Sequence, residues 1–296
     1  MQLFINIVRG FCMALADSVP GVSGGTVAFI LGFYDKFIGS LAHLMNGTKK
    51  ERKEAVFFLL KLMAGWLIGF CLSVLVLGKI FNTHIYELSS LFMGLSVFAL
   101  PIVVLEEKEV LKEKKQNVFF TVVGIVIVAM ITYLNANGRE AGAVDIANLS
   151  VGTAAYIFLV AMVAISAMVL PGISGSTLLL IFGLYVPIIS AIKEFLHFKF
   201  TYFWALVIFG LGMIAGILTV IKLVRAGLEK HRGMMVYLIL GLMIGALYAI
   251  VMGPTTLDIP QPAMTVKTFH PIFFLLGGII LFALQKLKGI SEANQG

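Results

Sequence analysis

Hydrophobic residues along the chain fall into ten long runs that are separated by short polar connections. A helix needs about 17–25 apolar residues to cross the hydrocarbon core of a membrane, and most of the runs reach that length. Strands of a membrane β-barrel would instead alternate with a period of two, which these runs do not. We therefore expect an all-α polytopic membrane protein. The runs span residues 1–17, 24–46, 55–78, 86–105, 117–134, 152–169, 174–192, 201–221, 234–252 and 270–287.

Composition supports this interpretation. Of the 296 residues, 60% are hydrophobic and only 12% are charged, which is more apolar than a soluble domain of this size requires. The net charge of +7 does not indicate nucleic-acid binding, because the basic residues lie in short loops between apolar runs. No His/Cys cluster indicates a metal site, and nothing in the sequence calls for a cofactor.

The basic residues also predict the sidedness of the chain. Three connections, 47–54, 106–116 and 222–233, each hold four Lys or Arg residues, and Lys286 and Lys288 lie at the C-terminal end, which makes 4+4+4+2 = 14. The intervening connections hold only five in total. Because cytoplasmic loops carry the excess of Lys and Arg, we expect both termini to be cytoplasmic.

A repeated motif divides the chain into two halves. The stretch "ADSVPGVSGGTVAFILGFYDKFI" (16–38) recurs as "AMVLPGISGSTLLLIFGLYVPII" (167–189), an offset of 151 residues. A weaker correspondence at offset 147 aligns Gly65, Gly69 and Gly94 with Gly212, Gly216 and Gly241. The sequence thus predicts a duplication, with a first repeat over 1–135 and a second over 150–288.

Each repeat holds five apolar runs, and an odd number of crossings brings the second repeat in from the opposite side of the membrane. Inverted repeats with interrupted helices are typical of secondary transporters, in which the breaks meet near the membrane midplane. Whether the first run of each repeat spans or re-enters is left open. The alternative is a duplicated scaffold whose glycines serve only close helix packing.

The residue types of the motif suit an anion. Proline favours the first turn of a helix, glycine lets the backbone turn, and Ser or Thr caps the helix. Helices that begin at 22–26 and 173–177 would aim N–H and hydroxyl donors at one place, which fits a phosphate monoester better than a cation. The predicted headgroup-binding residues are Pro20, Gly21, Ser23, Gly24, Gly25, Thr26, Pro171, Gly172, Ser174, Gly175, Ser176, Thr177 and Arg9.

Ionisable residues within the apolar runs are the other candidates. Asp17 precedes the first motif, and the corresponding residue of the second is Met168, so Asp17 is a candidate carrier of a coupling proton or sodium ion. Its alternative is a helix cap or a partner for a nearby base. Arg9 either faces the same site or extends to the cytoplasmic interface. Asp35 and Lys36, in a helix expected to continue from the motif, are interpreted as an ion pair or interfacial residues.

The two motifs together resemble those of the bacterial polyprenyl-phosphate transporter family, formerly a domain of unknown function. The resemblance covers nearly the whole chain, and the doubled motif is its specific part. It implies a lipid flippase in the bacterial cytoplasmic membrane that returns undecaprenyl phosphate from the outer to the cytoplasmic leaflet for reuse in cell-envelope synthesis. The second motif lacks the acid and has Ser176 where the first has Gly25, so unequal contributions are expected.

Two other functions remain open at this point. A transporter of a small soluble anion would use the same donors without an opening towards lipid. A membrane polyprenyl-diphosphate phosphatase also has inverted repeats with Ser/Gly-rich loops, but it places an arginine in the loop and carboxylates nearby. The second loop here carries Gly175 and Ser176 and no arginine, which disfavours phosphoryl chemistry.

Overall fold

The structure is a computed structural model, and every regular element in its described residues is a helix. The residues that it describes are 2–17, 23–72, 83–137, 144–147, 149–256 and 260–293. The first half of the chain contains α1 (Gln2–Asp17), α2 (Gly24–Ile30), α3 (Tyr34–Asn46), α4 (Lys49–Leu72), α6 (Ile85–Glu106), α7 (Lys108–Glu113), η2 (Lys115–Val118) and α8 (Phe119–Asn137). The second contains α9 (Val151–Val169), α10 (Gly175–Ile181), α11 (Tyr185–Leu196), α12 (Phe203–Lys230), α13 (Arg232–Met252), η3 (Gly253–Thr256) and α14 (Pro271–Ala293).

Within this described part, six helices are long and apolar enough to cross a membrane, or up to eight if each of two bent helix pairs counts as one span. The six candidates are Lys49–Leu72, Ile85–Glu106, Lys115–Leu134, Val151–Val169, Phe203–Lys230 and Arg232–Thr255. The chain is thus an all-helical protein with several candidate membrane spans, as the ten apolar runs predicted in kind.

The apolar runs 24–46 and 174–192 are each broken near their middle. The helix predicted to continue from the first motif is in fact two, with α2 and α3 bent by 119°, and α10 and α11 are bent by 110°. Gly32 and Gly183 lie at these bends with φ of +65°, a conformation that glycine adopts at little cost. Both bends have the same hydrogen bonds, in which the next residue donates its N–H to a carbonyl five residues back.

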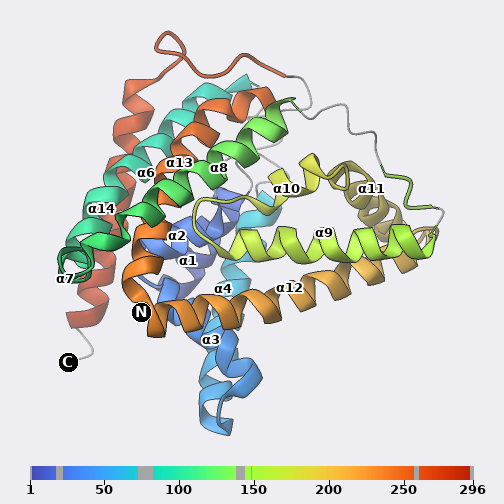
Figure 1. Ribbon diagram of the computed structural model, residues 1–296, viewed down its shortest axis with the longest axis horizontal. Coiled ribbons are helices and arrows are strands. Elements are labelled where there is room, and N and C mark those ends of the chain that lie inside the picture. The colour runs from blue at the N-terminus through green and yellow to red at the C-terminus, as the bar shows by residue number, and fades with distance from the viewer. Residues whose placement is uncertain are drawn as a thin grey trace.

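The long helices pack in four pairs. α1 packs along α4 just as α9 packs along α12, while α6 packs along α14 and α8 along α13. Figure 1 shows α9 and α12 side by side, crossing the group that contains α8 and α13. The first two pairs join helices of one half, and the other two join helices of different halves.

The glycines aligned at offset 147 lie at these helix contacts. A Cβ atom on Gly65 would overlap the carbonyl oxygen of Ile7 in α1, and one on Gly212 would overlap that of Phe158 in α9. Gly94 and Gly241 face the backbones of α14 and α8 in the same way. Small residues of this kind let helix backbones approach closely within a membrane. The packing interpretation of these glycines is therefore confirmed.

Gly65→Ala is expected to destabilise the α1–α4 pair by about 1–3 kcal/mol, because the added methyl group meets backbone that cannot move aside easily. The measurement is thermal unfolding of the purified protein in detergent. Gly210→Ala is the matched control, because a Cβ atom there has no neighbour within 4 Å. Equal unfolding temperatures for the two variants would contradict a close α1–α4 contact.

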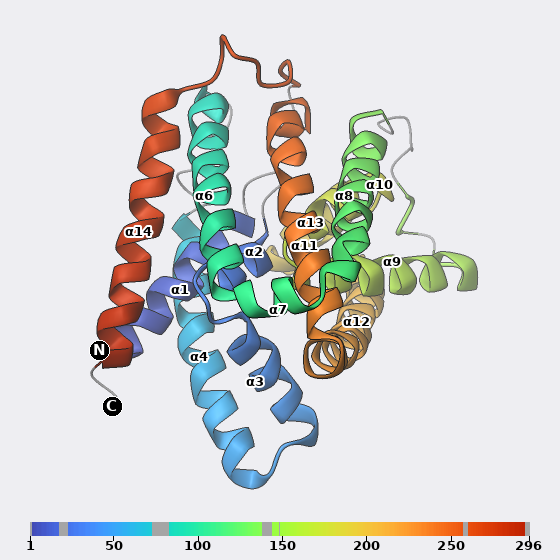
Figure 2. The ribbon, with the colours of Figure 1, turned by 60° about the vertical axis from the view of Figure 1, so that its left-hand side comes forward.

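The connections that are rich in basic residues lie towards one end of the molecule. In Figure 2 the turn between α3 and α4 and the C-terminal end of α14 lie towards the bottom, α7 lies at the lower end of α6, and the segment 260–270 lies at the top. At the lower end Arg232 of α13 pairs with Asp35 of α3 at 3.1 Å and with Glu107, which follows α6. Asp35 thus forms an exposed ion pair with Arg232 rather than an internal one, and this pair links the two halves.

Candidate functional site

The first motif starts α2 through its hydroxyl side chains. Ser23 is the N-cap residue with an extended backbone, and its Oγ accepts the N–H of Thr26 at 3.2 Å. The two hydroxyl oxygens lie 3.1 Å apart, and both side chains are buried. The predicted start of a helix between 22 and 26 is therefore confirmed. Pro20 and Gly21 lie outside the described residues.

The second motif starts α10 in a different way. Ser174 is at the N-cap position, but its hydroxyl group pairs with that of Ser176 at 2.8 Å. Gly172, two residues earlier, has a φ of +90°, and its Cα faces the backbone of Leu242 in α13. The helix begins at Gly175, within the predicted range. The loops differ, as the replacement of Gly25 by Ser176 suggested.

The two motifs are in direct contact. The N–H of Gly172 donates a hydrogen bond to Oγ1 of Thr26 at 2.7 Å, and the Ser23 hydroxyl donates to the carbonyl oxygen of Leu170 at 3.4 Å. Beside them, the Tyr34 hydroxyl donates to the carbonyl oxygen of Val169 at 3.1 Å. Residues about 146 positions apart thus form one polar cluster, which we call the paired-motif site.

Glycines set the separation of the two loops. A Cβ atom on Gly25 would lie 2.8 Å from the carbonyl oxygen of Val169, and one on Gly175 would lie 2.9 Å from that of Ala164. Close packing therefore explains part of the glycine content, as the alternative interpretation required. It does not account for the buried hydroxyl groups of Ser23 and Thr26, which instead accept backbone N–H groups of the two motifs.

Asp17, at the end of α1, lies beside the paired-motif site. Its Oδ1 accepts the N–H of Gly24 at 2.6 Å, and its Oδ2 accepts the indole N–H of Trp66 in α4 at 3.1 Å. The carboxylate therefore caps the start of α2, which was the alternative interpretation of this residue. A part in ion coupling stays a prediction.

Arg9 lies two turns before Asp17 in α1. Its guanidinium group stacks over the ring of Phe33 at 4.8 Å, and Nη1 donates to the side chain of Asn6 at 3.2 Å. Phe33 belongs to the bend that separates α2 from α3. Arg9 is thus placed at the far end of α2 from Ser23, which favours a role in holding the bend over direct contact with a headgroup.

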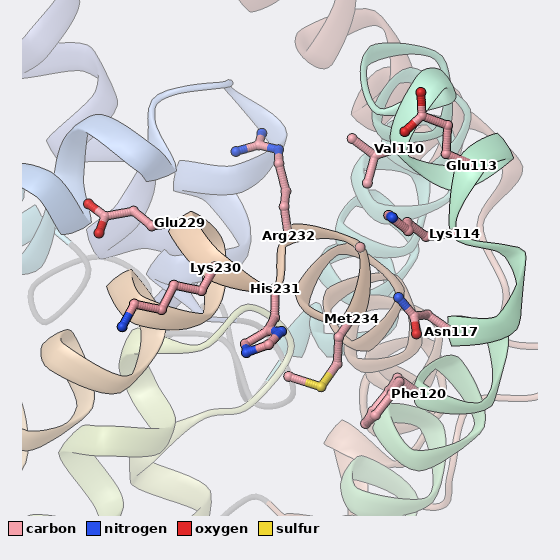
Figure 3. Close-up of a pocket in the computed structure, with 11 residues that line it drawn as sticks. Val110, Glu113, Lys114, Asn117, Phe120, Glu229, Lys230, His231, Arg232 and Met234 are labelled. Carbon is pink, nitrogen blue, oxygen red and sulfur yellow. The ribbon is translucent and has the colours of Figure 1, made fainter.

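A cavity of about 610 Å³ lies elsewhere, between the α7–α8 connection and the start of α13. Lys114, Asn117, His231 and Met234 are among the residues that line it, and Figure 3 shows Arg232 directed away from His231 and Met234. Leu242, which packs on Gly172, lies ten residues further along α13, roughly 15 Å at 1.5 Å per residue. The cavity is therefore separate from the paired-motif site.

Sequence reasoning missed Trp66 as a partner of Asp17. One signal was present: Trp66 follows Gly65, so its counterpart at offset 147 is Met213. Asp17 and Trp66 thus become Met168 and Met213 in the second half. A donor and its acceptor are replaced together by two apolar side chains.

Comparisons with known proteins agree with one another. The profile of a family described as undecaprenyl phosphate translocase-like matches residues 13–268. A polyprenyl-phosphate transporter of Staphylococcus aureus is 30% identical over 302 aligned residues, which cover 99% of this chain and 100% of the relative. One of Vibrio cholerae is 28% identical over 257 residues, which cover 83% and 77% of the two chains. No solved structure gives a significant match.

Proposed function

Because the chain belongs to the undecaprenyl phosphate translocase-like family, we propose that it returns undecaprenyl phosphate from the outer to the cytoplasmic leaflet. The family is one of bacterial membrane transporters and not of enzymes. One observation supports the assignment of this function to particular residues. The two motifs are in contact, and the N–H of Gly172 donates a hydrogen bond to the hydroxyl group of Thr26.

The physical task of such a protein is limited to the headgroup. A bare phosphate in hydrocarbon lacks the hydrogen bonds and the dielectric of water, and an isolated ionised group costs tens of kcal/mol by Born arguments. The polyprenyl tail pays no such cost and can stay among the lipid tails. A cluster of buried hydroxyl and N–H groups between helices supplies what the phosphate loses.

The paired-motif site fits this task in a closed state. Ser23 and Thr26 are fully buried, and their hydroxyl groups bond to one another and to the second motif. A phosphate that enters must therefore replace the bond between Thr26 and Gly172, which moves the two motifs apart. We propose that this exchange underlies alternating access. The first loop presents Ser23, Gly24, Gly25 and Thr26, and the second presents Gly172, Ser174, Gly175, Ser176 and Thr177.

We further propose that the halves over 1–135 and 150–288 are inverted repeats. The equivalent helix pairs, the equivalent bends at Gly32 and Gly183, and the glycines aligned at offset 147 support the duplication. The odd number of runs in each half and the alternation of basic connections support the inversion. Both termini are then cytoplasmic, and the paired-motif site lies near the membrane midplane.

Movement of undecaprenyl phosphate to the cytoplasmic leaflet needs a driving force. An inside-negative potential opposes the entry of each negative charge by about 2.3 kcal/mol per 100 mV. A coupled cation, a proton or a sodium ion, would offset this cost. Asp17 is the proposed carrier, because it lies beside the paired-motif site and the second half has no counterpart.

Binding of three ligands to the purified protein tests the substrate class. We expect undecaprenyl phosphate to bind, undecaprenol without phosphate to bind at least tenfold more weakly, and inorganic phosphate not to compete at millimolar concentration. Tight competition by inorganic phosphate, with its uptake into proteoliposomes, would support the alternative of a transporter for a small soluble anion.

Ser23→Ala combined with Ser174→Ala is expected to weaken the binding of undecaprenyl phosphate by roughly a hundredfold or more, because each of the two lost hydrogen bonds to a charged group contributes about 1.5–3 kcal/mol. Ser150→Ala, at an exposed helix cap remote from the two motifs, is the control for the loss of a serine cap. Unchanged affinity in the double variant would leave only backbone donors at the site.

A further inference from the structure

We infer that the coupling ion is a proton, bound by Asp17, and that Trp66 is the residue that positions this carboxyl group. The inference rests on the proposed function and names the ion that the proposed function leaves open. It depends on three described residues, Asp17 of α1, Gly24 of α2 and Trp66 of α4, and on the replacement of Asp17 and Trp66 by methionines in the second half.

The donors around Asp17 suit a carboxylate that gains and loses a proton. One oxygen accepts the Gly24 N–H at 2.6 Å and the other accepts the Trp66 indole N–H at 3.1 Å. Both groups turn the positive ends of their dipoles towards the carboxylate. A sodium ion at the same oxygens would be repelled by those positive ends. It would also require several oxygen ligands. A proton needs only one carboxyl oxygen.

The helices that pack around Asp17 contribute few other ionisable groups. α1 carries Arg9, whose guanidinium group stacks on Phe33, and Cys12. α2 carries none, and the residues 18–22 that follow Asp17 carry none in the sequence. α4 carries Lys61 and Cys71, each five positions from Trp66, and its remaining charged residues cluster in its first two turns. Asp17 is therefore the one acid among the described residues of these three helices near the paired-motif site.

In the second half a methionine lies where the first half has the carboxylate of Asp17. A Cβ atom on Gly24 would lie 2.8 Å from Oδ2 of Asp17, and one on Gly175 would lie 3.2 Å from the Cβ of Met168. Met168 thus occupies the place of the carboxylate, and Met213 follows Gly212 as Trp66 follows Gly65. The acid and its indole donor are present together in one half and replaced together in the other. The helix α10 begins without a carboxylate, so the start of such a helix does not by itself require one.

Trp66 also links the protonation of Asp17 to the contact between α1 and α4. Its ring stacks on Phe70 with centroids 5.0 Å apart, so the indole is fixed to α4 while its N–H reaches the end of α1. When Asp17 takes up a proton, the protonated oxygen loses its strength as an acceptor. The contact that holds α1, the start of α2 and α4 together then weakens beside the paired-motif site.

Intrinsic fluorescence tests this inference without any transport measurement. The chain has two tryptophans, and Trp204 is 66% exposed on α12, so Trp204→Phe leaves Trp66 as the single reporter. We expect one pH-dependent step in its emission, and we expect Asp17→Asn to remove that step. Emission that does not respond to pH, or that responds equally with Asp17→Asn, would overturn the inference.

Transport measurements then test the positioning role. Trp66→Phe keeps a ring to stack on Phe70 but removes the N–H that stabilises the charged carboxylate. The pH midpoint of undecaprenyl phosphate translocation is therefore expected to move upward by about one unit. Asp17→Asn should remove the pH dependence, and Met213→Phe, the matched change in the second half, should leave the midpoint in place. An unmoved midpoint with Trp66→Phe would contradict the role of the indole.

The dependence of translocation on sodium distinguishes a proton from a sodium ion as the coupling ion. Replacement of sodium by choline at constant pH is expected to leave translocation unchanged, and a dependence on sodium would overturn the inference. Failure of the proposed function has a different signature. In that case the fluorescence step at Asp17 persists while wild-type protein translocates no undecaprenyl phosphate at any pH. If translocation proceeds without any response to pH, the proton inference fails and the proposed function stands.

Discussion

Gly172→Ala is expected to abolish translocation and to lower the free energy of unfolding by about 3 kcal/mol or more. Gly172 has a φ of +90°, where a side chain is strained, and an added Cβ would overlap the backbone carbonyl of Leu242 in α13. The loop can relieve both only by moving, which carries its N–H away from Thr26. Translocation in proteoliposomes and thermal unfolding in detergent measure the two effects.

Gly152→Ala is the matched control for this change. Gly152 lies in the first turn of α9, and the nearest atom to an added Cβ is the hydroxyl oxygen of Ser150 at 3.7 Å, an ordinary contact. We expect that variant to unfold and translocate as the wild type does. A Gly172→Ala protein that keeps wild-type stability and rate would refute the requirement for this loop conformation.

Thr26→Val is expected to reduce the translocation rate at least tenfold while the protein stays folded. Valine has nearly the shape of threonine, but it leaves the buried N–H of Gly172 without its hydrogen-bond acceptor. A buried donor without a partner costs about 1–3 kcal/mol. The rate in proteoliposomes is the measurement, with thermal unfolding to verify that the fold is retained.

Two further variants are the controls for Thr26→Val. Thr26→Ser restores a hydroxyl group and is expected to recover most of the rate. Thr219→Val removes an exposed hydroxyl group that bonds only to its own helix at Ala215, and it should have no effect. If Thr26→Val translocates at the wild-type rate, the bond between the motifs has no part in transport.

Several features of the site were accessible from the sequence because they depend on local chemistry or on the duplication. Ser23 and Ser174 stand at the N-cap positions of helices that begin at Gly24 and Gly175, although only Ser23 makes a side-chain capping bond. Gly65 and Gly212, which the internal alignment matched, lie at corresponding helix contacts. Local backbone rules and self-comparison were sufficient for these features.

Other features depend on contacts that no local pattern encodes. The indole of Trp66 reaches Asp17 across 49 residues, and the Thr26 hydroxyl reaches Gly172 across 146. The bends at Gly32 and Gly183 were missed because the apolar runs continue without a break through them. In a chain this apolar, composition marks where helices lie, but only a positive-φ glycine and its tertiary setting decide whether one of them turns.

Leaflet exposure of undecaprenyl phosphate in proteoliposomes is the most direct test of the proposed function. The lipid is reconstituted in both leaflets, and the fraction that an added impermeant reagent can reach is followed over time. We expect vesicles with the wild-type protein to exchange the lipid between leaflets faster than empty vesicles, and vesicles with Ser23→Ala and Ser174→Ala to do so more slowly than the wild type. Exchange no faster than in empty vesicles, across the pH range in which the protein stays folded, would contradict lipid translocation by this chain.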